Sequence, residues 1–236
     1  MRFYLPPHDW ETASLEGDEA RHLAQVLRIK PGETVTVFDG RGRRAPAVVR
    51  GVSRDRVTLE IGEAVRQRQP RPAITLAQAI PKGKNMDLIV QKAVELGVGR
   101  IQPLVTRHTI VHPGEGKAEK WRRTALEACK QCGQDLLPDI AEPLPFDRWL
   151  ADGPDAGLRI IASLAPGSRP FRDVLRDHPQ TDAATLLIGP EGDFTPDETT
   201  AALNAGFLPV SLGPVVLRVE TASLYGISAL RYEFGD

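Results

Sequence analysis

Two short stretches near the end of the chain hold the residue types most able to do chemistry. The first, "LLIGPEGDFTPDE" (186–198), places Glu191 and Asp193 in a turn with two glycines and a proline. A P-loop needs a lysine and a dinucleotide-binding turn needs G-x-G-x-x-G, and this stretch has neither. Its acids repel phosphate and suit a neutral or cationic ligand, such as a nucleoside or a sulfonium. The alternative is a tight turn whose acids are simply exposed.

The second stretch, "LGPVVLRVETASL" (212–224), combines a cation with an acid. Arg218 stands among valines and a leucine, and a charge in an apolar setting generally needs a partner. A salt bridge to a nearby acid is the simplest such partner. Glu220 or Thr221 is predicted to cap the helix that follows.

Alternating strands and helices are predicted to position these stretches. We expect strands at 73–80, 100–106, 158–165, 185–189 and 208–213, and helices at 84–98, 117–133, 195–206 and 220–234. Asn85 is a predicted N-cap, Gly97 a helix stop, and Thr195 with Glu198 a capping box. Apolar strands in this alternation predict a mostly parallel sheet covered on both faces. Ligands bind such sheets at the carboxyl ends of strands, so the loops after Leu164, Ile188 and Leu212 are expected to share one pocket.

The first part of the chain, residues 1–68, has shorter elements. A helix with Asp18 as N-cap and a hairpin turning at Asp39-Gly40 predict a small β-barrel with one short helix. A polar, proline-bearing linker follows at 66–72, and the second domain is expected over 73–236. Residues 1–72 hold 13 basic residues against 10 acids, and 12 of the 13 are arginine. This balance favours an anionic partner.

Other chemistries find little support. Cys129 and Cys132 form a C-x-x-C without the second Cys or His pair that zinc needs, and they lie near a helix end rather than its start. We therefore expect small helix residues and no metal. His22 and His108 are expected to make hydrogen bonds rather than to act as catalysts. No apolar run spans a bilayer and the N-terminus lacks a secretory signal core, so a cytoplasmic protein without a membrane association is expected.

Five blocks of the sequence resemble one known family. In order they are "RHLAQVLRIKPGETVTVFDGRG", "KGKNMDLIVQKAVELGVGRIQPLVT", "KWRRTALEACKQCG", "LLIGPEGDFTPDE" and "LGPVVLRVETASLYGISAL". They are similar to the RsmE-type methyltransferases of small-subunit ribosomal RNA, in the SPOUT superfamily, and cover nearly the whole chain. The resemblance implies a PUA-like RNA-binding barrel followed by an α/β domain with a C-terminal trefoil knot. It also implies a homodimer that uses S-adenosyl-L-methionine to methylate a uridine at ring nitrogen 3, in the decoding region of 16S ribosomal RNA.

The resemblance also implies roles for individual residues. Arg218 would stabilise the uridine anion, with Glu220 or Glu191 as base or as a residue that orients the arginine. The expected cofactor-binding residues are Leu164, Gly189, Pro190, Glu191, Gly192, Leu212, Gly213, Leu217, Thr221 and Ala222. The expected RNA contacts are Arg2, Arg21, His22, Arg28, Arg43 and Lys82.

The chain departs from the family pattern at three places that are expected to face substrate. Gln134 stands where the family usually has an arginine, and Val215 stands where it often has a basic residue. The family's "TERS" run is "TRHT" here (106–109), and Arg107 and His108 are expected to compensate by a one-residue shift. Two alternatives stay open: a non-catalytic RNA-binding or ribosome-assembly factor, and a SPOUT enzyme acting on another RNA, such as transfer RNA. The RNA partner is naked 16S RNA or the assembled small subunit.

Overall fold

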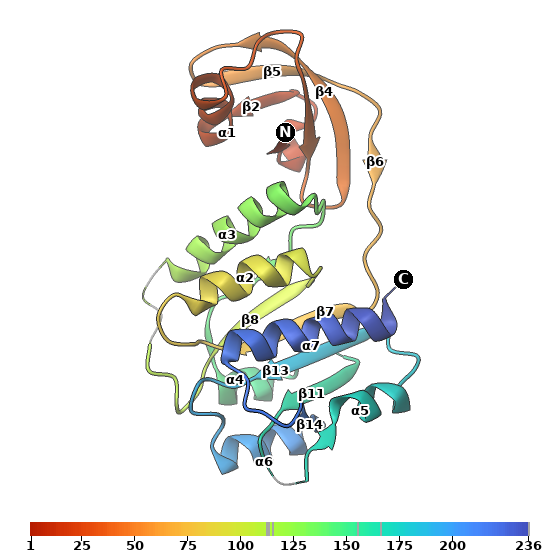
Figure 1. Cartoon of the computed structure of the whole chain (residues 1–236). Coiled ribbons are helices and arrows are strands. Elements are labelled where there is room, and N and C mark those ends of the chain that lie inside the picture. Colours follow the sequence, from red (N-terminus) through yellow and green to blue (C-terminus); the bar gives the residue numbers. More distant parts are fainter. Residues whose placement is uncertain (112–113, 115, 155, 166, 236) are drawn as a thin grey trace. The chain divides into compact units, whose positions relative to one another are not determined.

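The structure, a computed structural model, describes residues 1–111, 114, 116–154, 156–165 and 167–235. By its internal contacts the chain divides into two compact units (Figure 1). One unit comprises Met1–Gln69 with Leu126–Leu137, and the other comprises Pro70–Ala125 with Pro138–Asp236. Residues from the second half of a long helix therefore belong to the first unit, which the sequence pattern does not indicate.

The first unit is a small curled sheet. Its described strands are β1 (Arg2–Tyr4), β2 (Ser14–Glu16), β3 (Thr34–Phe38), β4 (Arg43–Val52), β5 (Arg56–Ile61) and β6 (Val65–Arg66). They are arranged in the order β1-β3-β4-β5-β2, with β6 paired to β4. Inward-facing side chains such as Phe3, Leu23, Val37 and Val49 form the core. The predicted β3–β4 hairpin is confirmed, and the Asp39 carboxylate fixes its turn by accepting the backbone N–H of Arg41 at 2.7 Å.

The helix of this unit differs from its prediction. It consists of α1 (Gly17–Arg21) and a π-helical turn, η2 (His22–Val26), with a 3-10 turn, η1 (Pro7–Asp9), earlier in the chain. Asp18 as N-cap is wrong: Glu16 occupies that position, and Asp18 pairs with Arg21 at 2.6 Å instead. The wider π turn shifts the helical register. Leu23 is buried, whereas Leu27, four residues later, is 38% exposed.

The second unit has the predicted parallel sheet. Its described strands are β7 (Ala73–Ala79), β8 (Arg100–Val105), β9 (Asp139–Ile140), β10 (Leu144–Pro145), β11 (Leu158–Ala162), β12 (Arg169–Pro170), β13 (Ala183–Ile188) and β14 (Leu208–Ser211). The order is β10-β8-β7-β13-β11-β14-β12, with β9 beside β8. All the pairings among these strands are parallel. Central strands such as β13 are buried along almost their whole length, because helices cover both faces.

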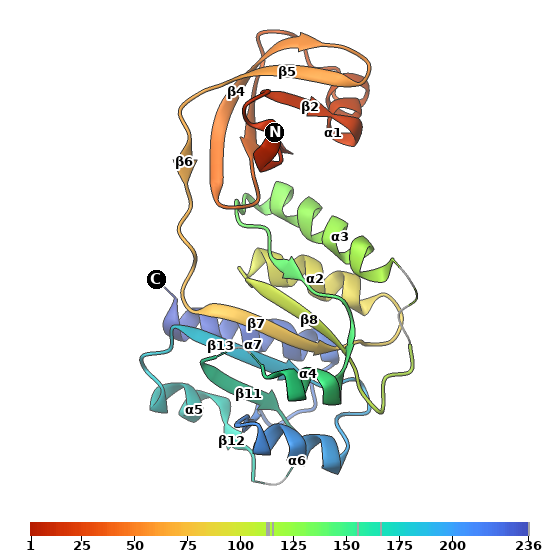
Figure 2. The same ribbon diagram turned by 180° about the vertical axis from the view of Figure 1, so that it is seen from behind.

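Helices lie on both faces of this sheet. Those of the described chain are α2 (Asn85–Glu95), α3 (Lys117–Cys132), α4 (Phe146–Asp152), α5 (Phe171–Asp177), α6 (Pro196–Asn204) and α7 (Val219–Phe234). The helices α2 and α7 cover one face (Figure 1), and α4, α5 and α6 cover the other (Figure 2). The sequence pattern missed α4 and α5 because each spans only seven residues, too few for a helical periodicity to be recognised.

The capping residues of α2 and α6 define the ends of these helices and of the loops next to them. The predicted capping box of α6 is confirmed, since Thr195 and Glu198 each bond the other's backbone N–H. Gly97 follows α2 with φ of +76°, a conformation that favours glycine. Asn85 as N-cap is wrong: Lys84 occupies that position, and Asn85 is the first residue of α2, with its side chain turned to another helix.

Polar contacts hold α7 against its neighbours. Ser223 donates to the buried Oε1 of Gln78 on β7 at 2.5 Å. Near the other end of α7, Arg231 donates to the carbonyl oxygens of Pro72 at 2.8 Å, Leu96 at 3.2 Å and Gly97. Burial lowers the pKa of Arg231, but these carbonyls complement its charge where α2 ends. Both ends of α7 are thereby held against neighbouring elements.

Candidate cofactor and active site

A cavity of about 480 Å³ opens at the carboxyl ends of β11, β13 and β14, beside the start of α7. This is where open α/β sheets bind ligands, and the volume falls in the range typical of small-molecule sites. The segments that follow β11, β13 and β14, at Leu164, Ile188 and Leu212, meet there, as predicted from the strand pattern. The cavity is lined by Asn85, Ala162, Ser163, Leu164, Ile188, Gly189, Pro190, Glu191, Asp193, Ser211, Leu212, Gly213, Val215, Val216, Leu217, Arg218, Val219, Glu220 and Ala222.

Most of the expected cofactor and catalytic residues therefore lie together. The exceptions are Gly192 and Thr221, which are not among the lining residues. Gly192 packs against the side chain of His108, since a Cβ added to Gly192 would lie 3.2 Å from the Cβ of His108. Thr221 is exposed on the first turn of α7.

The loop 189–194 after β13 is stiff for identifiable reasons. Asp193 has φ of +57° and closes a turn by donating its N–H to the carbonyl of Pro190 at 2.9 Å. The Asp193 carboxylate then accepts the N–H of Phe194 at 2.8 Å. A Cβ on Gly189 would lie 3.0 Å from that carboxylate, so only glycine fits without displacement. The loop thus offers a fixed wall to the cavity.

Two carboxylates of the cavity are already hydrogen-bonded. Glu191 Oε1 accepts the backbone N–H of Lys82 at 2.9 Å, which joins this loop to the one before α2. Glu220 Oε2 accepts an amide hydrogen of Asn85 at 3.3 Å. Glu191 is exposed, whereas Glu220 is half-buried at the start of α7, where the helix dipole favours negative charge.

The surroundings of the Arg218 side chain differ from those predicted. We expected an apolar setting that demands a salt bridge, but the side chain is exposed and forms no ion pair within the described residues. The reason is that the neighbouring Val215 and Val216 are themselves 66% and 76% exposed at the cavity. Arg218 also occupies the N-cap position of α7, and no side chain of the described chain caps that helix, so the predicted capping by Glu220 or Thr221 is wrong. A free cation therefore stands at the cavity.

Asn85 lines the cavity, although the sequence pattern does not predict a place for it there. It was assigned only to capping, although it follows the loop after β7, another strand-end loop on the same edge of the sheet. The rule that ligands bind at carboxyl ends of strands applies to this loop too. Applied to β7, the rule would have pointed to Asn85.

The "TRHT" run also lies beside the cavity loop. The backbone N–H of Arg107 donates to Glu198 Oε1 at 2.9 Å, and the ring nitrogen Nδ1 of His108 lies 2.9 Å from the carbonyl of Asp193. A carbonyl only accepts, so Nδ1 donates, as expected for a hydrogen-bonding histidine. Both side chains are exposed.

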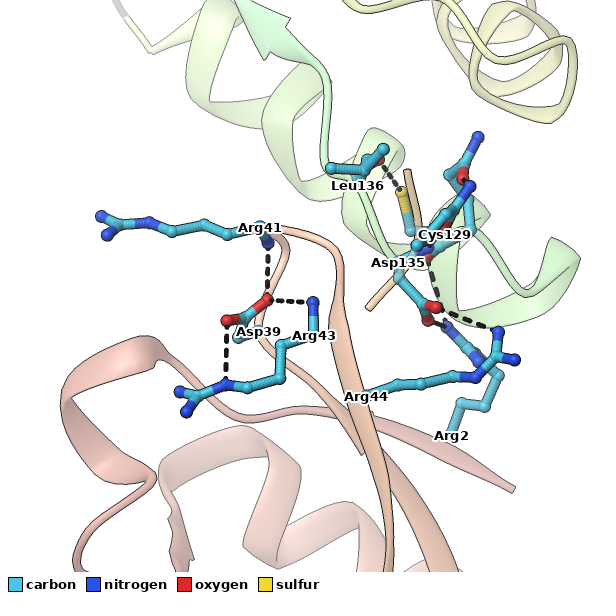
Figure 3. Close-up of polar contacts among 10 residues, drawn as sticks. Arg2, Asp39, Arg41, Arg43, Arg44, Cys129, Asp135 and Leu136 are labelled. Carbon is cyan, nitrogen blue, oxygen red and sulfur yellow. Dashed lines mark hydrogen bonds and ion pairs between the residues drawn. The ribbon is translucent and has the colours of Figure 1, made fainter. Parts of the chain in front are cut away.

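The expected RNA contacts fall into two groups. Arg2 is only 17% exposed and pairs with the fully buried Asp135 at 2.5 Å, and Arg43 pairs with Asp39 at 3.3 Å (Figure 3). The Arg43 guanidinium also stacks over Trp10. These internal pairings do not support phosphate contact. The exposed ones are Arg21, His22 and Arg28 in the first unit and Lys82 in the second, of which Arg21 pairs with Asp18.

Gln134, which is predicted to face substrate, is half-buried and hydrogen-bonded within the first unit. Its side chain bonds Gln67 and its carbonyl accepts from Arg2, both inside the first unit.

Cys129 and Cys132 are free thiols. Burial raises the pKa of Cys129 to about 12, so its thiol stays neutral and packs in the interior. The prediction of a small packing residue is therefore confirmed for Cys129. Cys132, by contrast, is exposed. Within the described ranges, no cluster of His, Cys, Asp and Glu is suited to a metal, and no helix could cross a membrane.

A parallel sheet with a strand-end cavity defines a ligand-binding α/β domain, and the same chain also contains a small curled-sheet domain. A family model described as an RNA methyltransferase domain matches residues 67–231, and one described as an RNA methyltransferase PUA domain matches 15–62. The chain therefore belongs to the RNA methyltransferase family. It is 32% identical over 222 residues to the ribosomal RNA small subunit methyltransferase E of Synechocystis sp., covering 93% of this chain and 72% of that protein.

Solved structures show the same fold. A methyltransferase from Legionella pneumophila, in complex with the cofactor SAM, is 33% identical with a TM-score of 0.90, covering 100% of this chain and 98% of that one. The ribosomal RNA small subunit methyltransferase E from Neisseria gonorrhoeae, bound to S-adenosyl methionine, gives the same identity, score and coverage. Both neighbours were therefore solved with the cofactor that the sequence predicted.

Proposed function

We propose that this protein transfers the methyl group of S-adenosyl-L-methionine to ring nitrogen 3 of a uridine in the decoding region of 16S ribosomal RNA, during small-subunit maturation. The observation that carries the proposal is the strand-end cavity, in a chain that matches SAM-bound relatives over its full length. The curated relatives are ribosomal RNA small subunit methyltransferases, which supports the substrate class. The position on the uridine is the finer part of the proposal.

The residues of the cavity fit the cofactor. Exposed apolar side chains, Leu164, Val215 and Val216, offer a slot for an adenine ring. Glu191 and Asp193 give the cavity wall negative charge that suits a positive sulfur. Gly213 has φ of +137° and open space where a Cβ would stand, so its backbone is accessible to a ligand.

Three charged residues of the cavity have distinct proposed roles. When bound, the cofactor supplies an electrophilic methyl group, and the uridine imide must give up its proton to accept it. Arg218, a cation without an acidic partner in the described chain, stabilises the negative charge that then spreads onto the uridine carbonyls. Glu220 accepts the proton. Glu191 shapes the loop, because its carboxylate is held by the N–H of Lys82.

Assembly and RNA binding are further parts of the proposal. We propose that the first unit binds RNA through exposed basic residues such as Arg28, and that the enzyme acts as a cytoplasmic homodimer without a metal. Tyr225 and Tyr232 on α7 are 49% and 90% exposed, which supports a dimer contact on that helix. The threading of the C-terminal segment as a trefoil knot is proposed from the family resemblance.

A methylation assay tests the proposed function. Purified protein is incubated with methyl-labelled cofactor and either 16S RNA or isolated small subunits, and the RNA is then digested to nucleosides. We expect label in 3-methyluridine alone, with one of the two substrates strongly preferred. RNA binding without methyl transfer would support the assembly-factor alternative, and label in another nucleoside would overturn the position on the base.

A further inference from the structure

The side chain of Asn85 links the starts of two helices at the cavity. Asn85 is the first residue of α2, is half-buried and lines the cavity. Its amide Nδ2 donates to Glu220 Oε2, in the first turn of α7, at 3.3 Å. The helices α2 and α7 pack against each other. The Glu220 carboxylate is therefore held by a residue of the neighbouring helix.

The turn that carries Asn85 is fixed on several sides. Before it, the N–H of Lys82 is bound by Glu191 at 2.9 Å. After it, Asp87 accepts from Trp121 Nε1 at 3.1 Å and from Lys120 Nζ at 2.5 Å. A polar group on a backbone fixed in this way keeps its direction without a large loss of entropy on binding. The direction of the Asn85 amide is thus set before a substrate arrives.

The Asn85–Glu220 pair has unused hydrogen-bonding capacity. A primary amide has two N–H groups and an accepting oxygen, and a carboxylate has two accepting oxygens. Within the described residues only one bond, that between Asn85 and Glu220, uses this capacity. The cavity is therefore lined by an N–H donor beside a carboxylate acceptor.

A uridine imide edge carries the complementary groups, an N3–H donor beside carbonyl acceptors. We propose that Asn85 is a positioning residue, which aligns Glu220 with N3 of uridine and donates its second N–H to the adjacent carbonyl. This inference rests on the proposed function and names the residues that select the imide. A cytosine has no N3–H to give to Glu220, so the pair favours uracil.

The step assigned to the pair is a proton transfer. The N3–H bond breaks, its electron pair stays on the imide, and the proton moves to the Glu220 carboxylate, from which water later removes it. The proton leaves before methylation, because the electron pair that it frees is the one that bonds the methyl carbon. The Asn85 N–H stabilises the charge that develops on the carbonyl oxygen.

Variants of Asn85 distinguish a role in aligning Glu220 with the substrate from a role in the stability of the fold alone. For Asn85→Ala we expect kcat to fall roughly 10- to 100-fold, with KM for RNA and the Kd of the cofactor within about threefold. Asn85→Gln keeps the amide and is expected to recover part of this loss. Asn85→Asp puts a second carboxylate beside Glu220, and neighbouring carboxylates hold a proton more tightly. The acidic limb of its kcat–pH profile should therefore move to higher pH. Gln91→Ala, an exposed amide on the same helix, is the control and should match wild type.

The pH experiment must consider the other charges at the cavity. Arg218, Glu191 and Asp193 line it with Glu220, and Lys84 precedes Asn85. These residues are the same in every Asn85 variant, so a shift seen only in Asn85→Asp reports on the pair. The thermal unfolding temperature is measured for each variant in parallel.

Three outcomes are distinguishable. Wild-type kcat and an unshifted pH profile in the Asn85 variants, beside an active wild type, would overturn this inference and leave the proposed function intact. A fall in activity that follows a fall in unfolding temperature, without rescue by glutamine, would show a structural role and also overturn it. An inactive wild type would remove the proposed function and the inference together.

Discussion

Replacing Arg218 with alanine is expected to lower the turnover of RNA methylation by about 100- to 1,000-fold, the cost of removing a group that stabilises transition-state charge. Arg218 lines the cavity, is exposed and has no acidic partner among the described residues. Its removal therefore leaves no buried charge unpaired. Cofactor affinity should stay within a few-fold, because a cation contributes little to holding a positive sulfonium.

Single-turnover kinetics with methyl-labelled cofactor and calorimetric titration of the cofactor measure the two effects separately. Arg218→Lys keeps the charge but loses the planar fork, so we expect intermediate turnover. Arg148→Ala removes an exposed arginine from α4, on the opposite face of the sheet, and should behave as wild type. Full turnover in Arg218→Ala would exclude the arginine from the chemistry.

The second large effect concerns stability. Asp135 is fully buried in the first unit, where its two carboxylate oxygens pair with Arg2 at 2.5 Å and Arg44 at 3.0 Å (Figure 3). Its backbone N–H also donates to Gln67 at 2.8 Å. Asp135→Ala is expected to lower the free energy of unfolding by about 3–5 kcal/mol, because it leaves the mostly buried Arg2 without a counter-charge.

Urea unfolding of the full chain measures the change in free energy, and hydrogen exchange locates it. Faster exchange is expected in residues 126–137 and in the strands that carry Arg2 and Arg44. Asp182→Ala is the matched control, because Asp182 pairs with Arg71 where both are more than two-thirds exposed. Such surface pairs contribute at most about 1 kcal/mol. Equal losses in the two variants would show that the buried network does not stabilise the unit.

Local sequence chemistry was enough to predict much of the fold and the cavity. Apolar strands gave the parallel sheet, and Thr195 with Glu198 gave the start of α6, because such signals lie within a few residues of the structure they specify. The strand-end rule then brought Leu164, Gly189 and Leu212 to one place. These predictions depend on periodicity, on capping and on the rule that ligands bind at the carboxyl ends of strands.

The errors share a different cause. Whether Arg218 needs a partner depends on whether Val215 and Val216 are buried, and they are exposed at a cavity that tertiary structure creates. The surroundings of Gln134 depend on a contact with Gln67, which is far away in the sequence. Asn85 was assigned to its own helix, although its partner is Glu220 on another. Long-range packing cannot be deduced from local pattern.

One measurement tests the central claim most directly. Nucleosides of 16S ribosomal RNA are quantified by mass spectrometry in a strain that lacks this gene, and in the same strain carrying the wild-type or the Arg218→Ala gene. We predict that 3-methyluridine is absent without the gene, returns with the wild type and stays nearly absent with the variant. Unchanged 3-methyluridine in the strain that lacks the gene would contradict the proposed function.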